Sequence, residues 1–300
     1  MKFSGAVLIR LPKENNAPLR NYWATKINMT ETFLSLLEKR VQDSSSLICI
    51  DLSPHIHDLS NPSAASALDF CLNLVQQTAP FAAAFNLNPA YFEIFGVEGM
   101  SMLKQVIDVI HNESTQIPVI LDVRRNEIGS AAEAYAKSAY ENLRANCITL
   151  NPYLGKDSIE PFVRDPQRGA FLLAKTSNAG SMDIQNALVL PSGSDSPMPM
   201  YIYIAHLAQE WNVNNNIGII VEAAHPQIMS MIRSSVPEMW FLSSGIKTQS
   251  GELELALRAG LRTDGKGVLI QVPNGIMHSG VAPAQAMKEL RDKILSITAI

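Results

Sequence analysis

Short runs of apolar residues alternate along the chain with longer stretches whose apolar positions recur at helical spacing. Eight apolar runs have the length of strands: 47–52, 82–87, 119–123, 147–150, 170–174, 217–221, 240–242 and 268–272. Helical segments are predicted between them, among others at 64–78, 100–111, 130–142, 199–212 and 251–259, with a last one at 284–295. Parallel strands that are buried on both faces read as continuous apolar runs, so the alternation predicts an α/β fold, a single-domain (β/α)8 TIM barrel.

A doubly wound sheet is the weaker interpretation of the same alternation. A Rossmann cofactor site begins with Gly-x-Gly-x-x-Gly after the first strand, and no such sequence follows residues 47–52. We therefore assign residues 29–300 to the barrel and residues 1–28 to an N-terminal extension that either packs on the barrel or stays mobile. A helix is expected to begin near Met29, with Thr30 as its N-cap.

Residues 178–199 also depart from the regular pattern. Their tip, Pro191 to Pro197, is rich in Ser, Gly and Pro and is too polar and broken for regular structure. Long loops that follow a barrel strand often act as lids, and a tolerated surface insertion is the alternative.

Composition limits the classes of partner. The chain of 300 residues is 47% apolar and 17% charged, with a formal net charge of −4, which describes a soluble globular protein. This charge gives no electrostatic reason to bind nucleic acid or an anionic membrane. No apolar run is long enough to span a membrane, and the N-terminus lacks the apolar segment of a signal peptide.

The cysteines indicate a reducing compartment. Cys49, Cys71 and Cys147 lie in apolar strand or helix patterns without the spacing of a metal site. They are expected to be reduced core residues of a cytoplasmic protein.

A dense group of charges follows the third predicted strand. Asp122, Arg124, Arg125 and Glu127 place two carboxylates and two guanidinium groups within six residues. Such a group at a strand end is either a functional site or a structural ion pair.

Polar residues also end most of the other predicted strands, where barrels of this type carry their chemistry. They are Ser53, Asn86, Asp122, Arg124, Lys175 to Ser177, Glu222, Ser244 with Gly245, and Asn274. Their convergence on one rim predicts a site for a small-molecule substrate. Arg124 would suit a substrate that carries a carboxylate.

Several segments resemble the longer bacterial type of orotidine 5′-phosphate decarboxylase, from about Met29 to the C-terminus. They are residues 84–93, 122–135, 150–158, 175–178 and 256–261. The resemblance implies a (β/α)8 barrel and a homodimer with sites at the subunit interface. It also implies decarboxylation of orotidine monophosphate without metal or organic cofactor.

The chain departs from the family pattern at the residues that carry the reaction. A substrate-binding aspartate aligns with Ser53 and a lysine with Asn86, and the family's Asp-x-Lys-x-x-Asp array appears as Asp122, Arg124 and Glu127. In the family the lysine of this array protonates the carbanion left by loss of carbon dioxide. Arginine holds its proton too firmly for that role.

The phosphate-binding end departs as well. The family's glycine-rich loop keeps Gln249 and Gly251 but has Lys247 and Ser250 in place of glycines, and a phosphate-binding arginine aligns with Asn274. The resemblance assigns contacts with the pyrimidine to Ser177 and Gln249.

Two acids stand where the family has glycine. They are Asp51 in the first strand and Glu222 at the end of the sixth. Asp51 shares a strand face with Ser53, so it either lines the barrel interior as an internally hydrogen-bonded acid or takes part in the site, and Glu222 is either a charge near a helix N-terminus or a site residue.

These residues support three hypotheses. The leading one is a cofactor-independent lyase, decarboxylase or proton-transfer enzyme that acts on a substrate other than orotidine monophosphate. Its catalytic residues would be Asp122, Arg124 and Glu127, and its substrate-binding residues Ser53, Asn86, Ser177, Glu222, Gln249, Gly251 and Asn274. The first alternative is a catalytically inactive pseudoenzyme that serves as a binding or assembly partner. The second is the ordinary orotidine monophosphate decarboxylase of pyrimidine synthesis, which fits the resemblance but not the replaced residues.

Overall fold

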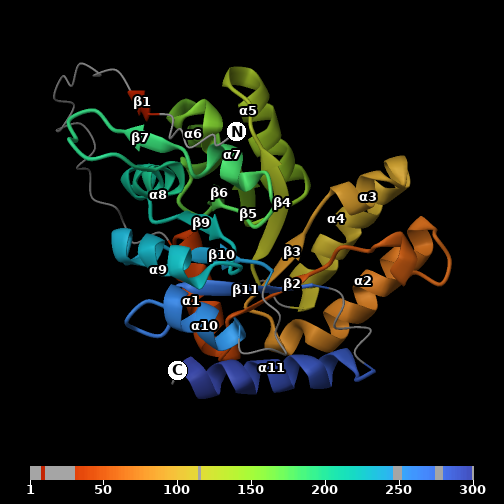
Figure 1. Ribbon diagram of the computed structural model, residues 1–300. Coiled ribbons are helices and arrows are strands. Elements are labelled where there is room, and N and C mark those ends of the chain that lie inside the picture. Colours follow the sequence, from red (N-terminus) through yellow and green to blue (C-terminus); the bar gives the residue numbers. More distant parts are fainter. Residues whose placement is uncertain (1–7, 11–30, 114–115, 246–251, 274–279, 299–300) are drawn as a thin grey trace, which may run out of the picture.

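Eight parallel strands form a closed barrel in the computed structural model, which describes residues 8–10, 31–113, 116–245, 252–273 and 280–298 (Figure 1). In chain order these strands are β2 (Ile48–Asp51), β3 (Ala84–Leu87), β4 (Val119–Arg125), β5 (Cys147–Leu150), β6 (Gly169–Lys175), β9 (Ile217–Val221), β10 (Phe241–Ser243) and β11 (Val268–Val272). Each pairs with the next in the chain, and β11 pairs with β2 to complete the barrel. The prediction of a (β/α)8 barrel is confirmed.

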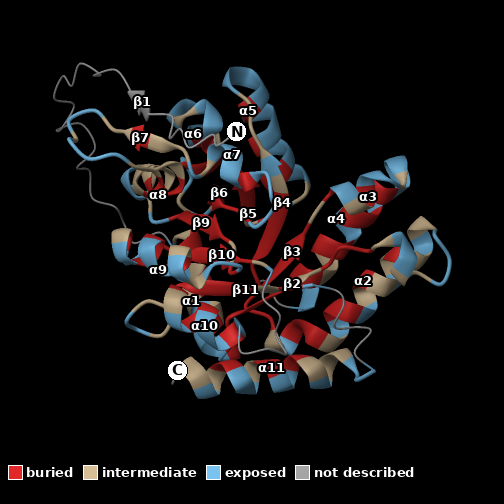
Figure 2. Ribbon diagram, in the orientation of Figure 1, coloured by how far each residue is buried: buried red, intermediate tan, exposed pale blue. Residues whose placement is uncertain are grey.

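Helices lie around the barrel and at its two ends. They are α1 (Phe33–Ser44), α2 (Ala64–Thr78), α3 (Ala90–Glu93), α4 (Gly96–Glu113), α5 (Gly129–Lys137), α6 (Lys156–Val163), α7 (Ser181–Ile184), α8 (Met200–Trp211), α9 (Pro226–Ser235), α10 (Glu252–Gly260) and α11 (Pro283–Thr298). Figure 2 shows buried strands surrounded by helices with a buried inner side and an exposed outer side. No helix in the described part of the chain is both long and apolar enough to cross a membrane.

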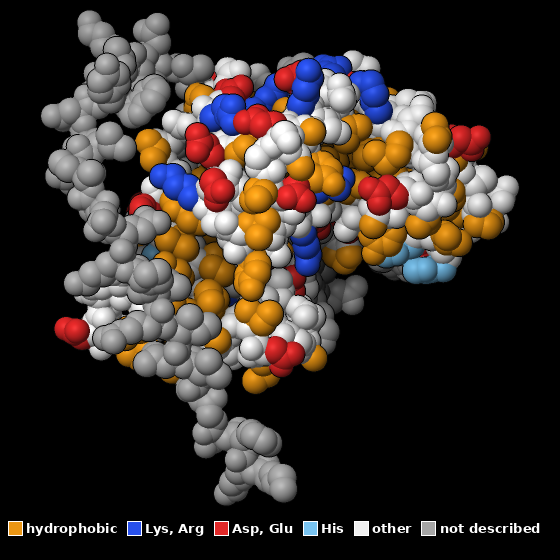
Figure 3. Space-filling model, turned by 90° about the horizontal axis from the view of Figure 1, so that it is seen from above, with side chains coloured by type: hydrophobic (Ala, Val, Ile, Leu, Met, Phe, Trp, Pro, Cys, Tyr) orange, Lys and Arg blue, Asp and Glu red, His pale blue; other side chains and the backbone are white. Residues whose placement is uncertain are grey.

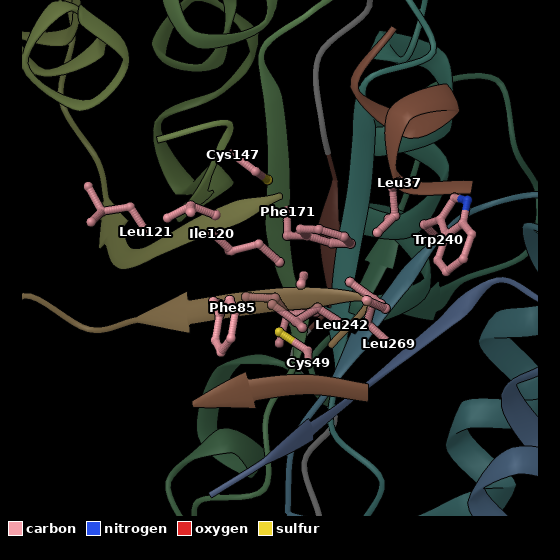
Figure 4. Close-up of a cluster of buried hydrophobic side chains, with 14 of the residues drawn as sticks. Leu37, Cys49, Phe85, Ile120, Leu121, Cys147, Phe171, Trp240, Leu242 and Leu269 are labelled. Atoms are coloured by element: carbon pink, nitrogen blue, oxygen red, sulfur yellow. The ribbon is translucent and has the colours of Figure 1, made fainter. Parts of the chain in front are cut away.

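The barrel interior is filled by aliphatic and aromatic side chains. Cys49, Ile120, Phe171 and Leu242 come from four different strands and belong to one buried cluster (Figure 4). Phe85 of the same cluster lies on the outer face of β3, since it alternates with Asn86. The three cysteines are free and buried, as expected from their apolar surroundings. Burial raises the pKa of the Cys49 and Cys147 thiols well above its usual range, so these thiols stay neutral.

Helix α1 packs against the amino ends of the strands. The carboxyl ends of the strands form the opposite end of the barrel, which we call its mouth. Its Phe33 ring lies where a Cβ on Gly169 would be, since that atom would meet Phe33 at 2.1 Å. Phe33 also makes an edge-to-face contact with Phe171, with ring centroids 6.3 Å apart. The absence of a side chain at Gly169 therefore lets α1 approach the barrel closely.

The start of α1 differs in detail from the prediction. Thr32 is the N-cap, and it forms a capping box in which Ser35 N–H donates to Thr32 Oγ1 at 3.2 Å. Thr30 lies outside the described residues. Thr30 and Thr32 both lie within three residues of the first helical residue, so the sequence offers two N-caps. Ser35 lies three residues after Thr32 and completes the capping box with it.

A second, small sheet lies outside the barrel. Strand β1 (Leu8–Arg10) pairs in parallel with β7 (Leu188–Leu190), which pairs antiparallel with β8 (Met198–Pro199). The tip at 191–197 has neither helix nor strand, as predicted, but its flanks carry α7, β7 and β8. The pairing of β1 with β7 joins segments roughly 180 residues apart, and these short strands leave no periodicity in the sequence. The division into residues 1–28 and 29–300 stays a prediction.

Candidate active site

The carboxyl ends of the strands bring most of the predicted site residues to one mouth of the barrel. Asn86 lies in β3 and Asp122 in β4, while Ser53, Ser177 and Glu222 directly follow β2, β6 and β9. Ser53, Asn86 and Asp122 are buried, and Ser177 is exposed. The remaining predicted residues, Gln249, Gly251 and Asn274, lie outside the described residues, as does Lys247.

Asp122 is held by a hydroxyl and by the cation beside it. Thr149 of β5 donates its hydroxyl to Asp122 Oδ1 at 2.7 Å, and Arg124 Nε lies 3.5 Å from the same oxygen. The side chain of Asp122 is 9% exposed and that of Arg124 is 45% exposed, so the carboxylate is fixed while the guanidinium reaches solvent. Arg124 is therefore available to a ligand in the mouth.

Thr149 is a site residue that the sequence analysis missed. It is fully buried, and it accepts a hydrogen bond from Arg124 N–H at 2.9 Å while it donates to Asp122. The sequence contained an indication of this role. Thr149 is the only residue with a hydroxyl in the predicted strand 147–150, and a polar side chain inside a buried strand needs a hydrogen-bond partner.

The backbone at Arg124 has an unusual conformation. Its φ is +48°, in the left-handed region, and the register between β4 and β5 shifts between Leu121 and Arg125. Non-glycine residues in this region are strained by roughly 1 to 3 kcal/mol and cluster at functional sites. The shift thus falls at Arg124, whose Nε faces Asp122.

Asp51 forms a second group beside Asp122, which we call the Asp51 cluster (Asp51, Ser53, Asn86 and Gln271). Asp51 Oδ1 accepts hydrogen bonds from Ser53 Oγ at 2.7 Å and from Asn86 Nδ2 at 3.4 Å. Burial raises the pKa of Asp51 to about 6; hydrogen bonds from Ser53, Asn86 and Gln271 oppose this shift, and the charge of Asp122 adds to it. The Asp51 carboxyl therefore keeps its proton to a higher pH than an ordinary aspartate does.

On the opposite side of the barrel, Glu222 binds Ser177. The backbone N–H of Ser177 donates to Glu222 Oε2 at 2.9 Å, and its hydroxyl donates to the same oxygen. Nearby, buried Lys175 donates to Ser181 Oγ at 2.9 Å, and burial lowers the pKa of this lysine while Glu222 partly restores it. Both donors of Ser177 are therefore engaged within the protein.

Glu127 lies beyond the end of β4, at the start of α5. Its Oε1 accepts the backbone N–H of Ile128 at 2.9 Å, a favourable place for a negative charge ahead of a helix. The neighbouring Arg125 lies over the ring of Tyr135, with Cζ 4.2 Å from the centroid. The structure does not join Glu127 to Asp122 through any contact among the described residues.

A groove of about 580 Å³ lies away from this mouth, on the outer surface. It is lined by residues of α5, α6 and the segments that follow them, including Glu133, Tyr140, Arg164 and Arg168. Arg164 is ion-paired with Glu133 across it. Acidic and basic side chains also alternate along the upper part of the face in Figure 3. None of the predicted site residues lines the groove.

The chain is similar to known proteins over most of its length. The family model described as "Orotidine 5′-phosphate decarboxylase / HUMPS family" matches residues 58–290. The orotidine 5′-phosphate decarboxylase of Roseiflexus castenholzii is 34% identical over 272 residues, which cover 87% of this chain and 97% of that protein. The protein of the same name from Cupriavidus taiwanensis is 36% identical and covers 83% of this chain and 90% of its own length.

A solved structure gives the same result. The OMP decarboxylase of Leishmania donovani superposes with a TM-score of 0.79 at 40% identity, and the match covers 90% of this chain and 99% of that one. The likeness therefore extends to both sequence and fold.

Proposed function

The chain belongs to the orotidine 5′-phosphate decarboxylase / HUMPS family, and from this premise we propose that it is an enzyme that decarboxylates orotidine 5′-phosphate. The observation that carries the proposal is the similarity to decarboxylases, which extends over nearly the whole length of this chain and of the chains aligned with it. The reaction class is that of a carbon–carbon lyase, and the substrate is a small molecule.

The leading hypothesis of the sequence analysis, an enzyme for a different substrate, is wrong. Relatives from bacteria and from Leishmania donovani are named for orotidine 5′-phosphate, at 34 to 40% identity. The hypothesis weighed individual replacements at the mouth above the similarity of the remaining chain. The alternative of an ordinary decarboxylase is the better supported one.

Arg124 and Asp122 are the proposed centre of the site. A guanidinium that is 45% exposed can bind the substrate carboxylate through two parallel hydrogen bonds. Asp122, fixed by Thr149, holds Arg124 in place and sets a negative charge beside the group that leaves. This arrangement orients the carboxylate for loss of carbon dioxide.

The other predicted residues are proposed to bind the rest of the nucleotide. Ser53 and Asn86 present polar groups beside Asp51, and Glu222 with Ser177 presents a carboxylate oxygen that can accept a ring N–H. Gln249, Gly251 and Asn274 are proposed to contact the pyrimidine and the phosphate, as the family resemblance implies.

We further propose a homodimer in which Glu127 approaches the mouth of the partner subunit. Support comes from exposed apolar side chains on loops that follow β4 and β5: Ile128 is 52% exposed, Tyr153 79% and Leu154 43%. A cytoplasmic location is proposed from the three buried, free cysteines.

The test is turnover of orotidine 5′-phosphate by the purified chain, followed as formation of uridine 5′-phosphate and carbon dioxide. We expect Asp122→Asn to lower kcat/KM by about 100-fold or more, since a fixed charge next to the reacting group is removed. Asp43→Asn removes an exposed carboxylate on α1 and should match the wild type. Saturable binding of the substrate without turnover would contradict the proposal and favour the inactive pseudoenzyme.

A further inference from the structure

The reaction proposed above leaves an electron pair on the pyrimidine ring when the bond to the carboxyl carbon breaks. That carbon must then receive a proton. Arg124 is the cation closest to Asp122 among the described residues, but a guanidinium does not release its proton in this pH range. Another group in the mouth has to act as the acid.

Asp51 has the position that this role requires. It is the last residue of β2, its Cα is in register with Asn86 of β3, and its carboxyl is hydrogen-bonded to Ser53. Ser53 and Asn86 are buried, whereas Asp51 is only partly buried. Asp51 is therefore less buried than its two neighbours, and their hydrogen bonds fix the orientation of its carboxyl.

A second observation indicates that a ligand meets this cluster. Asn86 is 0% exposed, and its Oδ1 has no hydrogen-bond partner among the described residues. The amide that carries this oxygen is directed at the cluster, since its Nδ2 contacts Asp51. An unpaired buried acceptor costs roughly 1 to 3 kcal/mol, so the site suits a ligand with a donor at this point.

We propose that Asp51 is the catalytic acid that protonates the ring carbon after carbon dioxide leaves. The bond between the ring and the carboxyl carbon breaks, its electron pair stays on the ring, and carbon dioxide departs. The ring carbon then forms a bond to the proton of the Asp51 carboxyl, whose O–H bond breaks. The resulting carboxylate takes a proton from water before the next turnover.

The surroundings keep a protonated fraction of Asp51 available. Burial is the largest cause of its pKa of about 6, and the charge of Asp122 on β4 raises it further. The other titratable groups that face it are the thiols of Cys49 on β2 and Cys71 on α2, which stay neutral. With this pKa, roughly a tenth of the molecules carry the proton at pH 7.

The experiment measures kcat for orotidine 5′-phosphate from pH 5 to pH 9 in the wild type, Asp51→Asn, Asp51→Glu and Asp43→Asn. We expect the wild-type value to fall about tenfold for each pH unit above 6, and Asp43→Asn to follow it. Asp51→Asn should be slower by about 100-fold or more at pH 6 and should lose the fall with pH. Asp51→Glu, which keeps an acid, should retain the fall at a reduced rate. Melting temperatures of the variants show whether they are folded.

The outcomes separate this inference from the proposed function. If the wild type turns over the substrate and Asp51→Asn keeps its rate and pH profile, Asp51 is not the acid although the function stands. If the wild type binds the substrate but forms no product at any pH, the decarboxylase function is lost, and the role of Asp51 with it.

Discussion

At the scale of single residues, Asp51 affects stability as well as the proposed reaction. Its pKa is about 6 in the folded chain and about 3.9 in an unfolded one, so the folded state binds the proton more tightly. The stability that this proton contributes is fully present below pH 4 and is lost as the pH rises through 6. Above that pH the buried carboxylate destabilises the fold relative to acid conditions, by at most about 3 kcal/mol.

Asp51→Asn should therefore stabilise the protein in neutral and alkaline solution. We expect a higher free energy of unfolding at pH 8, by up to about 3 kcal/mol, and no gain at pH 4. Urea unfolding at the two pH values measures this, with Asp43→Asn as the exposed control. An equal gain at both pH values would show that the effect does not come from ionisation.

The pair of Asp122 and Arg124 makes a different prediction. Arg124 is 45% exposed, so water can solvate its charge when the partner is removed. Asp122→Asn should cost less than about 1 kcal/mol of stability while it lowers kcat/KM, because Asn can still accept from Thr149. A loss of several kcal/mol in thermal or urea unfolding would instead identify a structural ion pair.

At the scale of elements, apolar periodicity was sufficient to predict the barrel. The runs at 147–150 and 217–221 coincide with β5 and β9, and the stretch at 64–78 coincides with α2. These elements bury one or both faces, which makes their pattern visible in the sequence. The capping of α1 depends on specific side chains, and the β1–β7 pairing depends on strands that are distant in the chain, so periodicity could not predict them.

The candidate site was predicted only in outline for a related reason. Strand ends identify Asn86 and Asp122, since position along a barrel strand determines which rim they reach. The register shift at Arg124 and the hydrogen bond from Thr149 to Asp122 arise from the tertiary pairing of β4 with β5, which strand ends do not reveal.

The contact of α1 with the barrel gives a test at the same scale. Gly169→Ala would bring a methyl group to 2.1 Å from the Phe33 ring, so the helix or the strand has to move. We expect a loss of about 1 to 3 kcal/mol in urea unfolding. Gly180→Ala is the matched control, because its nearest contact is at an ordinary 3.6 Å, and an equal effect of the two changes would contradict this account.

At the scale of the whole molecule, the exposed apolar rim makes the proposed dimer testable. Sedimentation at micromolar concentration should give a two-fold dimer, and Tyr153→Asp should shift it towards monomer. Val213 is equally exposed, at 79%, but precedes β9 at the opposite end of the barrel, so Val213→Asp should leave the dimer intact. A wild-type monomer would exclude the interface and the shared site.

The pairing of β2 with β11 has a consequence for synthesis of the protein in the cell. These strands are roughly 220 residues apart in the chain, yet they are neighbours in the closed barrel. A ribosome that adds about 5 to 20 residues per second needs roughly 10 to 45 s between them. Throughout that time the nascent chain carries β2 with one unpaired edge of backbone N–H and C=O groups, which other chains can bind. Newly made protein should therefore depend on chaperones until its last strand has left the ribosome.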